Sequence, residues 1–252
     1  MKKLHSSVLR FAPSLGLAAS IMLTGCASSG NKPTSEGSAT TTSAVSGPPR
    51  KVRADDGRMI ELGKASPAAG GGVNFKNPHM EKCWLADGFD FNGYDTLYIA
   101  PTVSTAKIDP KNTEEQKVLE MARENLIQEL VRAIESKRIF NRVVTKEGEI
   151  KPGVKTLKLE NTITEFAKGG GAARYFVGLY GGGQPVLRVQ GKISEGNNTV
   201  FNYEARRSGT SAGARLGGVF MKDEDIQFED IHSLVLDLTD FMAGRAGKYS
   251  AL

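Results

Sequence analysis

Residues 209–213 read Gly-Thr-Ser-Ala-Gly and match G-x-S-x-G, a motif whose serine hydroxyl attacks an acyl carbon. Asp225 and His232 follow Ser211 in the chain order of hydrolase triads. The motif needs a strand before the serine and a helix after it, but the Arg-Leu-Gly-Gly run at 215–218 is a poor helix start. We therefore interpret Ser211 as a loop residue and His232 as a partly exposed structural histidine.

A second motif, Ser-Thr-Ala-Lys at 104–107, matches the S-x-x-K nucleophile of penicillin-binding enzymes. The Ser-Asp-Asn and Lys-Thr-Gly motifs that accompany it in those enzymes are not in the sequence. The match also falls in a polar stretch after Pro101, which suits a loop. We expect no catalytic residue and a protein that is not an enzyme.

Ligands for metals and cofactors are also sparse. His79 and His232 have no HExxH, CxxC or carboxylate spacing around them. Neither G-x-x-x-x-G-K-[ST] nor G-x-G-x-x-G is present, so a phosphate cradle is not indicated. The basic residues form no cluster of the kind that binds nucleic acid. We expect no cofactor, no metal and no nucleic-acid partner.

The N-terminus has the organisation of a secretory signal, with basic residues followed by an uncharged apolar run at 11–23. The Leu-Thr-Gly-Cys run at 23–26 resembles the lipobox of bacterial lipoproteins. That resemblance implies a signal peptide at 1–25, cleavage before Cys26 and a lipid on its thiol. The alternatives are an ordinary signal peptide with a chance cysteine, or a membrane-spanning anchor. The apolar run is short for an anchor, which needs roughly 20 residues to cross about 30 Å of hydrocarbon.

Processing at Cys26 bears on charge, cysteine pairing and location. The leader holds three of the 33 basic residues and none of the 28 acidic ones, so the mature chain has a net charge of only +2. Cys83 is then the single remaining thiol, either a buried apolar residue or a reactive or intermolecular one. Ala27 stands where an Asp would resemble an inner-membrane retention signal. We therefore expect attachment to the outer membrane on its periplasmic side.

The segment after the cysteine is rich in Ser, Thr, Gly, Ala and Pro up to about residue 49, which is typical of a flexible chain. The next piece is ambiguous, because residues 59–62 suit a short strand while three glycines at 70–72 suit a loop. We assign 26–75 to the lipidated cysteine and its tether, and 76–252 to the folded periplasmic domain.

Two long segments have helical periodicity. The first begins at Thr113, with Gln116 completing a capping box, and fades near 137. Its apolar positions are Val118, Leu119, Ala122, Leu126, Ile127, Leu130, Val131 and Ile134. The second begins with Asp223 as its cap and is stopped by Gly244 and Gly247. Its apolar stripe is Ile231, Leu234, Val235, Leu238, Phe241 and Met242.

Strand patterns lie between and before these helices. Apolar and polar residues alternate over 187–193 and 201–205 around a turn-rich segment, which predicts a hairpin with one buried and one wet face. A partner strand is indicated at 157–163, a buried strand at 96–100 and a small edge strand at 143–144. The order predicts an α+β fold, a mostly antiparallel sheet with two helices on one face, with a parallel βαβ sheet as the alternative.

Two glycine-rich blocks, at 169–183 and 209–220, interrupt this regularity, and each interleaves aromatic and small residues with one arginine. If the hairpin forms, the blocks flank its open end. They suit either tight structural loops or a surface that contacts a partner or a membrane. For the partner-binding interpretation, the candidate contacts are Arg174, Tyr175, Phe176 and Tyr180.

Residues 172–178, Ala-Ala-Arg-Tyr-Phe-Val-Gly, and the alternating strand at 186–193 resemble the core of an uncharacterised bacterial lipoprotein family, domain of unknown function 4410. The resemblance spans roughly 94–242. It implies a cell-envelope lipoprotein of α+β type with no established activity. A looser similarity to the curli secretion lipoprotein and to activators of peptidoglycan synthases is an analogy of fold alone.

Together these features lead us to expect a non-enzymatic adaptor or assembly factor, held to the outer membrane by the lipid on Cys26. Its partner would be another cell-envelope protein. The alternatives are a small-ligand or glycan-binding domain, and a subunit of a secretion or pore complex. A pore subunit would need membrane-spanning strands of about 9 to 11 alternating residues, and residues 169–183 alternate poorly.

Overall fold

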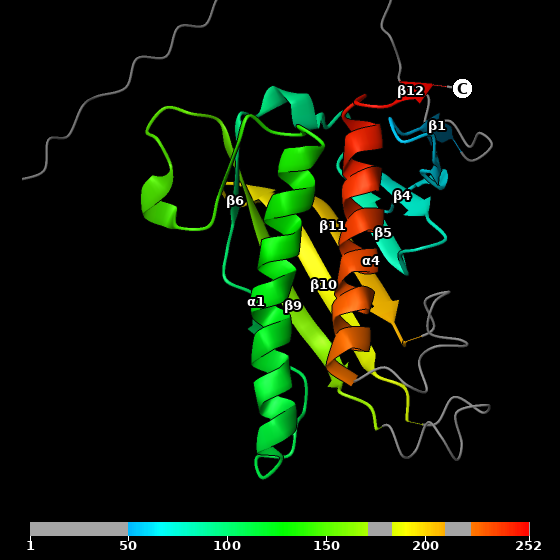
Figure 1. Ribbon diagram of the computed structural model, residues 1–252. Helices are drawn as coiled ribbons and strands as arrows, with labels where there is room; N and C mark the ends of the chain where they lie inside the picture. Colours follow the sequence, from blue (N-terminus) through cyan, green and yellow to red (C-terminus); the bar gives the residue numbers. More distant parts are fainter. Residues whose placement is uncertain (1–49, 171–182, 210–222, 252) are drawn as a thin grey trace, which may run out of the picture. The chain divides into compact units, whose positions relative to one another are not determined.

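The computed structural model describes residues 50–170, 183–209 and 223–251 (Figure 1). Within these ranges nine strands form one mixed sheet, in the order β3-β4-β5-β11-β10-β9-β6-β8, with β7 paired to β9. Their bounds are β3 Lys64–Pro67, β4 Val73–Lys76, β5 Lys82–Leu85, β6 Thr96–Ile99, β7 Val103–Ser104, β8 Arg142–Val144, β9 Thr156–Ala167, β10 Val186–Glu195 and β11 Asn198–Arg207. A small second sheet has the order β12-β1-β2, with β1 Lys51–Arg53, β2 Met59–Glu61 and β12 Ser250–Ala251.

The predicted hairpin is the antiparallel pair β10 and β11. Val189 lies opposite Ala205, and Lys192 lies opposite Asn202. Side chains alternate across the pair, because successive residues of a strand point to opposite faces of the sheet. Leu187, Val189 and Ile193 are fully buried on one face, whereas the other face is polar. β9 continues the antiparallel order beyond β10, as expected from its own alternation.

The far side of the sheet is parallel. β6 pairs in parallel with β8 and with β9, and β7 also pairs in parallel with β9. The helix α1, Thr113–Ser136, lies in the chain between β6 and β8. The predicted α+β class is confirmed, with this parallel part added to the antiparallel one.

The cap of α1 differs from the predicted one by one residue. Asn112, not Thr113, is the N-cap, and its side-chain oxygen accepts from the backbone N–H of Glu115 at 3.1 Å. The Asn112 amide nitrogen also donates to the Glu115 carboxylate at 2.9 Å. Gln116 instead donates to the carbonyl of Pro110 at 3.1 Å. Asn112 is a better cap than Thr113 because its amide accepts from the backbone N–H of Glu115 and also donates to the Glu115 carboxylate.

The second helix, α4, spans Asp223–Arg245, and the whole predicted apolar stripe is buried. It ends where Gly247 adopts a left-handed φ of 66°. The N–H of Lys248 donates to the carbonyl of Ala243 at 2.9 Å, which closes the last turn. Gly244 lies inside the helix and does not end it, and a Cβ there would come within 2.6 Å of Leu62.

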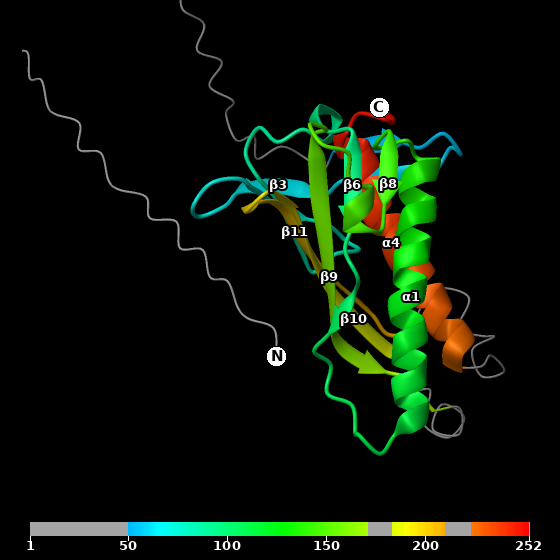
Figure 2. The same ribbon diagram turned by 90° about the vertical axis from the view of Figure 1, so that its left-hand side faces the viewer.

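Both helices cover the same face of the sheet, as Figures 1 and 2 show. Phe201 of β11 stacks on Phe241 of α4 with ring centroids 5.7 Å apart, so the helices and the sheet share one core. The helices run parallel to each other. Near their first turns they bond to the end of β9, and near their other end Lys137, the C-cap of α1, pairs with Asp240 of α4. Both helices therefore begin at one end of the pair, which we call the starting end, and both finish at the other, which we call the finishing end.

Strands occupy part of the predicted tether. β1 to β4 lie between Lys51 and Lys76, so folded structure begins by Lys51 and not near 76. Val52 and Phe75 enter the main core from these strands, and β1 pairs with β12 close to the end of the chain. The rest of the predicted leader and tether lies outside the described residues. In the described ranges, neither helix has the length and apolar character needed to span a membrane.

Candidate functional site

The residues that the sequence singled out for binding and lipidation, Cys26, Arg174, Tyr175, Phe176 and Tyr180, lie outside the described residues. Their roles remain predictions.

The two catalytic motifs are tested only in part, because Ser211 lies outside the described residues. Asp225 is exposed, and Nδ1 of His232 lies 3.0 Å from a carboxylate oxygen of Glu129 on α1. The Ser104 hydroxyl donates to the carbonyl of Ile163 and accepts from the N–H of Ala106. His232 therefore links two helices, and Ser104 fixes the loop after β7.

The two glycine-rich blocks leave and rejoin the fold at one place, which we call the root end and define by residues 167–170, 183–185 and 209. The N–H of Gly170 donates to the carbonyl of Gly183 at 2.9 Å. Gly209 packs so closely that a Cβ there would lie 2.9 Å from Pro185. The roots of both blocks therefore touch, as the open end of the hairpin predicts.

Helix α4 holds the root end with two buried polar side chains. Gln227 donates to the carbonyl of Ala167 at 2.7 Å, and Asp230 accepts from the N–H of Gly209 at 2.8 Å. Sequence reasoning missed both residues. The signal was present, because Gln227 and Asp230 fall at helical spacing on the apolar stripe that continues with Ile231 and Leu234.

Helix α1 supports the same end with its first turn. The backbone N–H of Lys168 donates to Glu115 at 3.3 Å, and the Lys168 ammonium pairs with Glu114 at 2.7 Å. Acidic side chains in the first turn also suit the positive end of the helix dipole. The end of β9 is thus bonded to both helices just before the first block begins.

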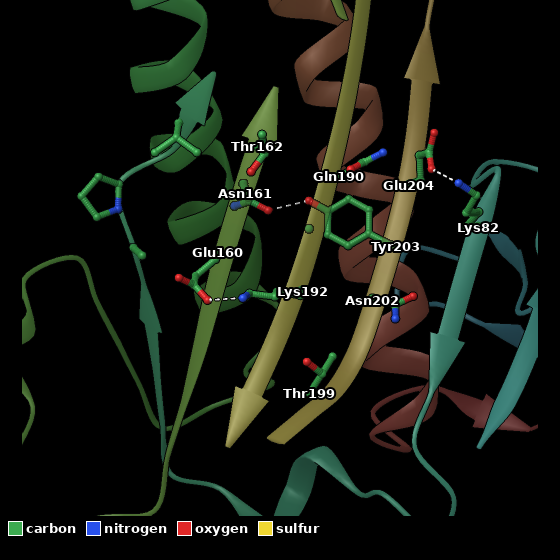
Figure 3. Close-up of a pocket in the computed structure, with 14 residues that line it drawn as sticks. Lys82, Glu160, Asn161, Thr162, Gln190, Lys192, Thr199, Asn202, Tyr203 and Glu204 are labelled. Carbon is green, nitrogen blue, oxygen red and sulfur yellow. Dashed lines mark hydrogen bonds and ion pairs between the residues drawn. The ribbon is translucent and has the colours of Figure 1, made fainter. Parts of the chain in front are cut away.

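A groove of about 580 Å³ lies on the sheet, and residues of five strands and the segment after β6 line it (Figure 3). Thr162, Gln190 and Asn202 line it from the face that points away from the helices, because they alternate with buried residues of β9, β10 and β11. Ala100, Pro101 and Val103 form an apolar border, and Val103 is half exposed. Most residues that line the groove have polar side chains, and the groove is open to solvent.

Ion pairs flank the groove (Figure 3). Glu160 pairs with Lys192 at 3.1 Å on one side, and Lys82 pairs with Glu204 at 2.5 Å on the other. The bonded Lys82 ammonium lowers the pKa of Glu204, and Arg188, at 2.7 Å, adds to the effect against the opposing effect of burial. These charges are paired with one another, so the groove has no strong field of either sign.

A buried polar pair lies within the sheet beside the groove. The Tyr203 hydroxyl donates to the side-chain oxygen of Asn161 at 2.8 Å (Figure 3). The Tyr203 ring crosses Gly191, where a Cβ would come within 2.2 Å of the ring. Burial raises the pKa of the Tyr203 hydroxyl. Gly191 is thus required by close packing, which the strand pattern alone did not show.

Cys83 is buried and free, and burial raises the pKa of its thiol. The interpretation of Cys83 as a buried apolar residue is confirmed. Among the described residues, no group of three or more His, Cys, Asp or Glu side chains is placed to hold a metal ion.

The family follows from the sequence of the core. The sequence model described as "Domain of unknown function (DUF4410)" matches residues 90–222, more than half of the chain. The chain belongs to this family. The match includes the sheet from β6 to β11, helix α1 and both glycine-rich blocks. The resemblance expected from the sequence is therefore confirmed, while the lipid anchor remains a prediction. No curated protein matches the chain.

Several solved structures are similar. The PelC dodecamer from Paraburkholderia phytofirmans has 11% identity and a TM-score of 0.39, and the alignment covers 62% of this chain and 96% of that one. A DUF330 protein from Xanthomonas campestris has 12% identity and a TM-score of 0.35, with 61% and 86% covered. A putative neuraminyllactose-binding hemagglutinin homolog from Helicobacter pylori has 10% identity and a TM-score of 0.31, with 60% and 84% covered. Likenesses of this size carry no argument about function.

Proposed function

We propose that this protein is an outer-membrane lipoprotein, anchored through Cys26, that acts without catalysis as an adaptor or assembly factor for another cell-envelope protein. Partner binding takes place through the glycine-rich blocks, with Arg174, Tyr175, Phe176 and Tyr180 as the main contacts. Arginine and aromatic residues are the types enriched at interface hot spots.

The observation that carries the proposal is the root end. Two blocks of similar composition start from touching roots, although they are separated in sequence by the β10–β11 hairpin. Buried Gln227 and Asp230 each bond to these roots, Gln227 through its amide nitrogen and Asp230 through its carboxylate. Fixing the roots of two loops beside each other reduces the entropy that the loops must lose when a partner orders them.

The experiment is a crosslinked pull-down from cells. Arg174→Ala and Tyr175→Ala each remove a hot-spot side chain, and a loss of roughly 2 kcal/mol would lower capture of the partner by about thirtyfold. Arg142→Ala, at an exposed arginine on edge strand β8, is the matched control and leaves capture unchanged. Unchanged capture by folded Arg174→Ala and Tyr175→Ala variants would refute the proposal.

The groove supports a second candidate, a glycan-binding domain. Its uncharged amide and hydroxyl groups, from Thr162, Gln190 and Asn202, suit the hydroxyls of a neutral sugar, since the flanking charges are already paired. Binding of the protein to a panel of neutral oligosaccharides would be measured for the wild type and for Gln190→Ala. Binding that Gln190→Ala abolishes would support this candidate, and no binding to any member would remove it.

A further inference from the structure

The finishing end of the two helices carries a cluster of basic side chains. We call it the basic end, and its cations include Arg50, Lys51, Arg53, Arg58, Lys137, Arg138, Arg245 and Lys248. A hollow of about 480 Å³ lies here, between the β1–β2 turn, the end of α1 and the segment after α4. Strand β1 adjoins that segment, because Arg53 pairs with Ser250 of β12.

Opposing charge at the basic end is only partly available. Asp240 is buried and bonds to Lys137, Arg58 and the hydroxyl of Tyr249. Other described carboxylates near these cations are Asp55 and Asp56 on the hollow, Glu61 opposite Lys51, and exposed Glu135 in the last turn of α1, and Asp56 pairs with Arg58 at 2.6 Å. The exposed cations among the described residues of this end are Arg50, Lys51, Arg53, Arg58, Arg138 and Lys248. They outnumber the exposed carboxylates, which are Asp55, Asp56 and Glu135.

An exposed apolar side chain lies among these cations. Met59 is 51% exposed and lies opposite Arg53 in the β1–β2 hairpin, on the outer face. Val52 and Ile60 take the inner face, and Val52 is buried in the core. An exposed apolar side chain beside exposed cations favours binding at the headgroup region of anionic membranes.

Along the chain, this surface is the first described part after the proposed anchor. Arg50 lies 24 residues after Cys26 in the sequence, and if this tether is flexible, as its composition predicts, its mean span is roughly 27 Å. We infer that the basic end docks on anionic phospholipid of the membrane that holds the anchor. This inference rests on the proposed lipidation of Cys26. The helices then hold the root end away from the membrane, and a 24-residue helix such as α1 is about 36 Å long.

The test uses the full lipidated protein in vesicles of phosphatidylglycerol and phosphatidylcholine, compared with phosphatidylcholine alone. Met59→Cys carries a polarity-sensitive fluorophore, and buried Cys83 does not compete for labelling. We expect the probe to enter an apolar environment on the anionic vesicles alone, and to return to water at high salt. Lys51→Glu with Arg53→Glu should lower the equilibrium constant for docking at least about 25-fold, at roughly fivefold for each cation lost near the surface.

The matched control reverses two exposed lysines before α1, Lys107→Glu with Lys111→Glu, and leaves the docked fraction unchanged. Mass spectrometry of the peptide that contains Cys26 tests the anchor in the same sample. An unacylated Cys26 would refute the anchor. Acylated protein whose Met59 probe gives the same signal on both vesicles would refute the docking alone.

Discussion

Arg138 has a backbone conformation that a side chain disfavours. Its φ is 51°, and among the described residues it is the one non-glycine position with a positive φ. Arg138 follows the last turn of α1. Its backbone N–H donates to the carbonyl of Glu135 at 3.0 Å, and the N–H of Ile139 donates to the carbonyl of Ile134 at 3.4 Å. Glycine usually occupies such a position, because it adopts the left-handed region without steric cost.

Arg138→Gly is therefore expected to raise the free energy of unfolding by about 1 kcal/mol, the usual steric cost of the left-handed region. Urea denaturation measures the change. Glu135→Gly, an exposed change inside the helix, should lower the stability by a similar amount. A lower midpoint for Arg138→Gly would contradict this account of the helix end.

Gly191 leads to a prediction of opposite sign. An added Cβ would meet the Tyr203 ring at 2.2 Å inside a packed sheet, so Gly191→Ala should destabilise the fold by about 1–3 kcal/mol. Gly93→Ala is the control, because a Cβ there has no atom within 4 Å. Equal thermal midpoints for the two variants would show that Tyr203 has room to move.

At the scale of elements, the root end joins three parts of the fold. The ends of β9 and β11 and the start of β10 meet there, and α1 and α4 bond to them. If partner binding depends on how the blocks are held, a change at a root should reduce binding even when the blocks themselves are intact.

Gly209→Ala is the change that tests this. It adds a Cβ within 2.9 Å of Pro185 at a φ of 61°, and should lower partner capture in the crosslinked pull-down about tenfold. Gly57→Ala carries the same backbone strain, at a φ of 84°, but in open space in the β1–β2 turn. Capture should be unchanged for Gly57→Ala, and equal capture by both variants would count against a role for the roots.

The polar face of the sheet makes stability depend on pH. Lys82 and Arg188 hold the pKa of Glu204 below its ordinary value of 4.5. A lowered pKa in the folded state means that this stabilisation is complete above about pH 4.5 and is lost as the pH falls below it. Urea midpoints at pH 7 and at about pH 3.5 should therefore differ, and Glu204→Gln should reduce the difference. Exposed Glu149→Gln should leave it unchanged, and a Glu204→Gln variant with the full difference would refute the assignment.

At the scale of the whole molecule, the long elements were predictable because their patterns are local. The stripe from Ile231 to Met242 and the alternation from Leu187 to Ile193 each repeat often enough to define a buried face. The strands β1 to β4 are three or four residues long, too short to show a period. β1 also pairs with β12, almost 200 residues later in the chain, and no local pattern reports such a pairing.

The candidate site was less predictable than the fold. The glycine-rich blocks stood out by composition. The residues that bond to their roots, Gln227 and Asp230, did not, because in the sequence they look like interruptions of an apolar stripe. The groove depends on side chains from several strands and on the segment after β6, so it exists only after the sheet is assembled.

The central claim is that the glycine-rich blocks bind another envelope protein, and in-cell photocrosslinking tests it most directly. A photoreactive residue replaces Tyr175 in one strain and exposed Glu149 in a control strain, and mass spectrometry identifies the products in the membrane fraction. The account predicts one dominant envelope protein crosslinked from position 175 and none from position 149. Crosslinks from position 175 that remain within this chain would contradict it, and would mean that the blocks serve packing.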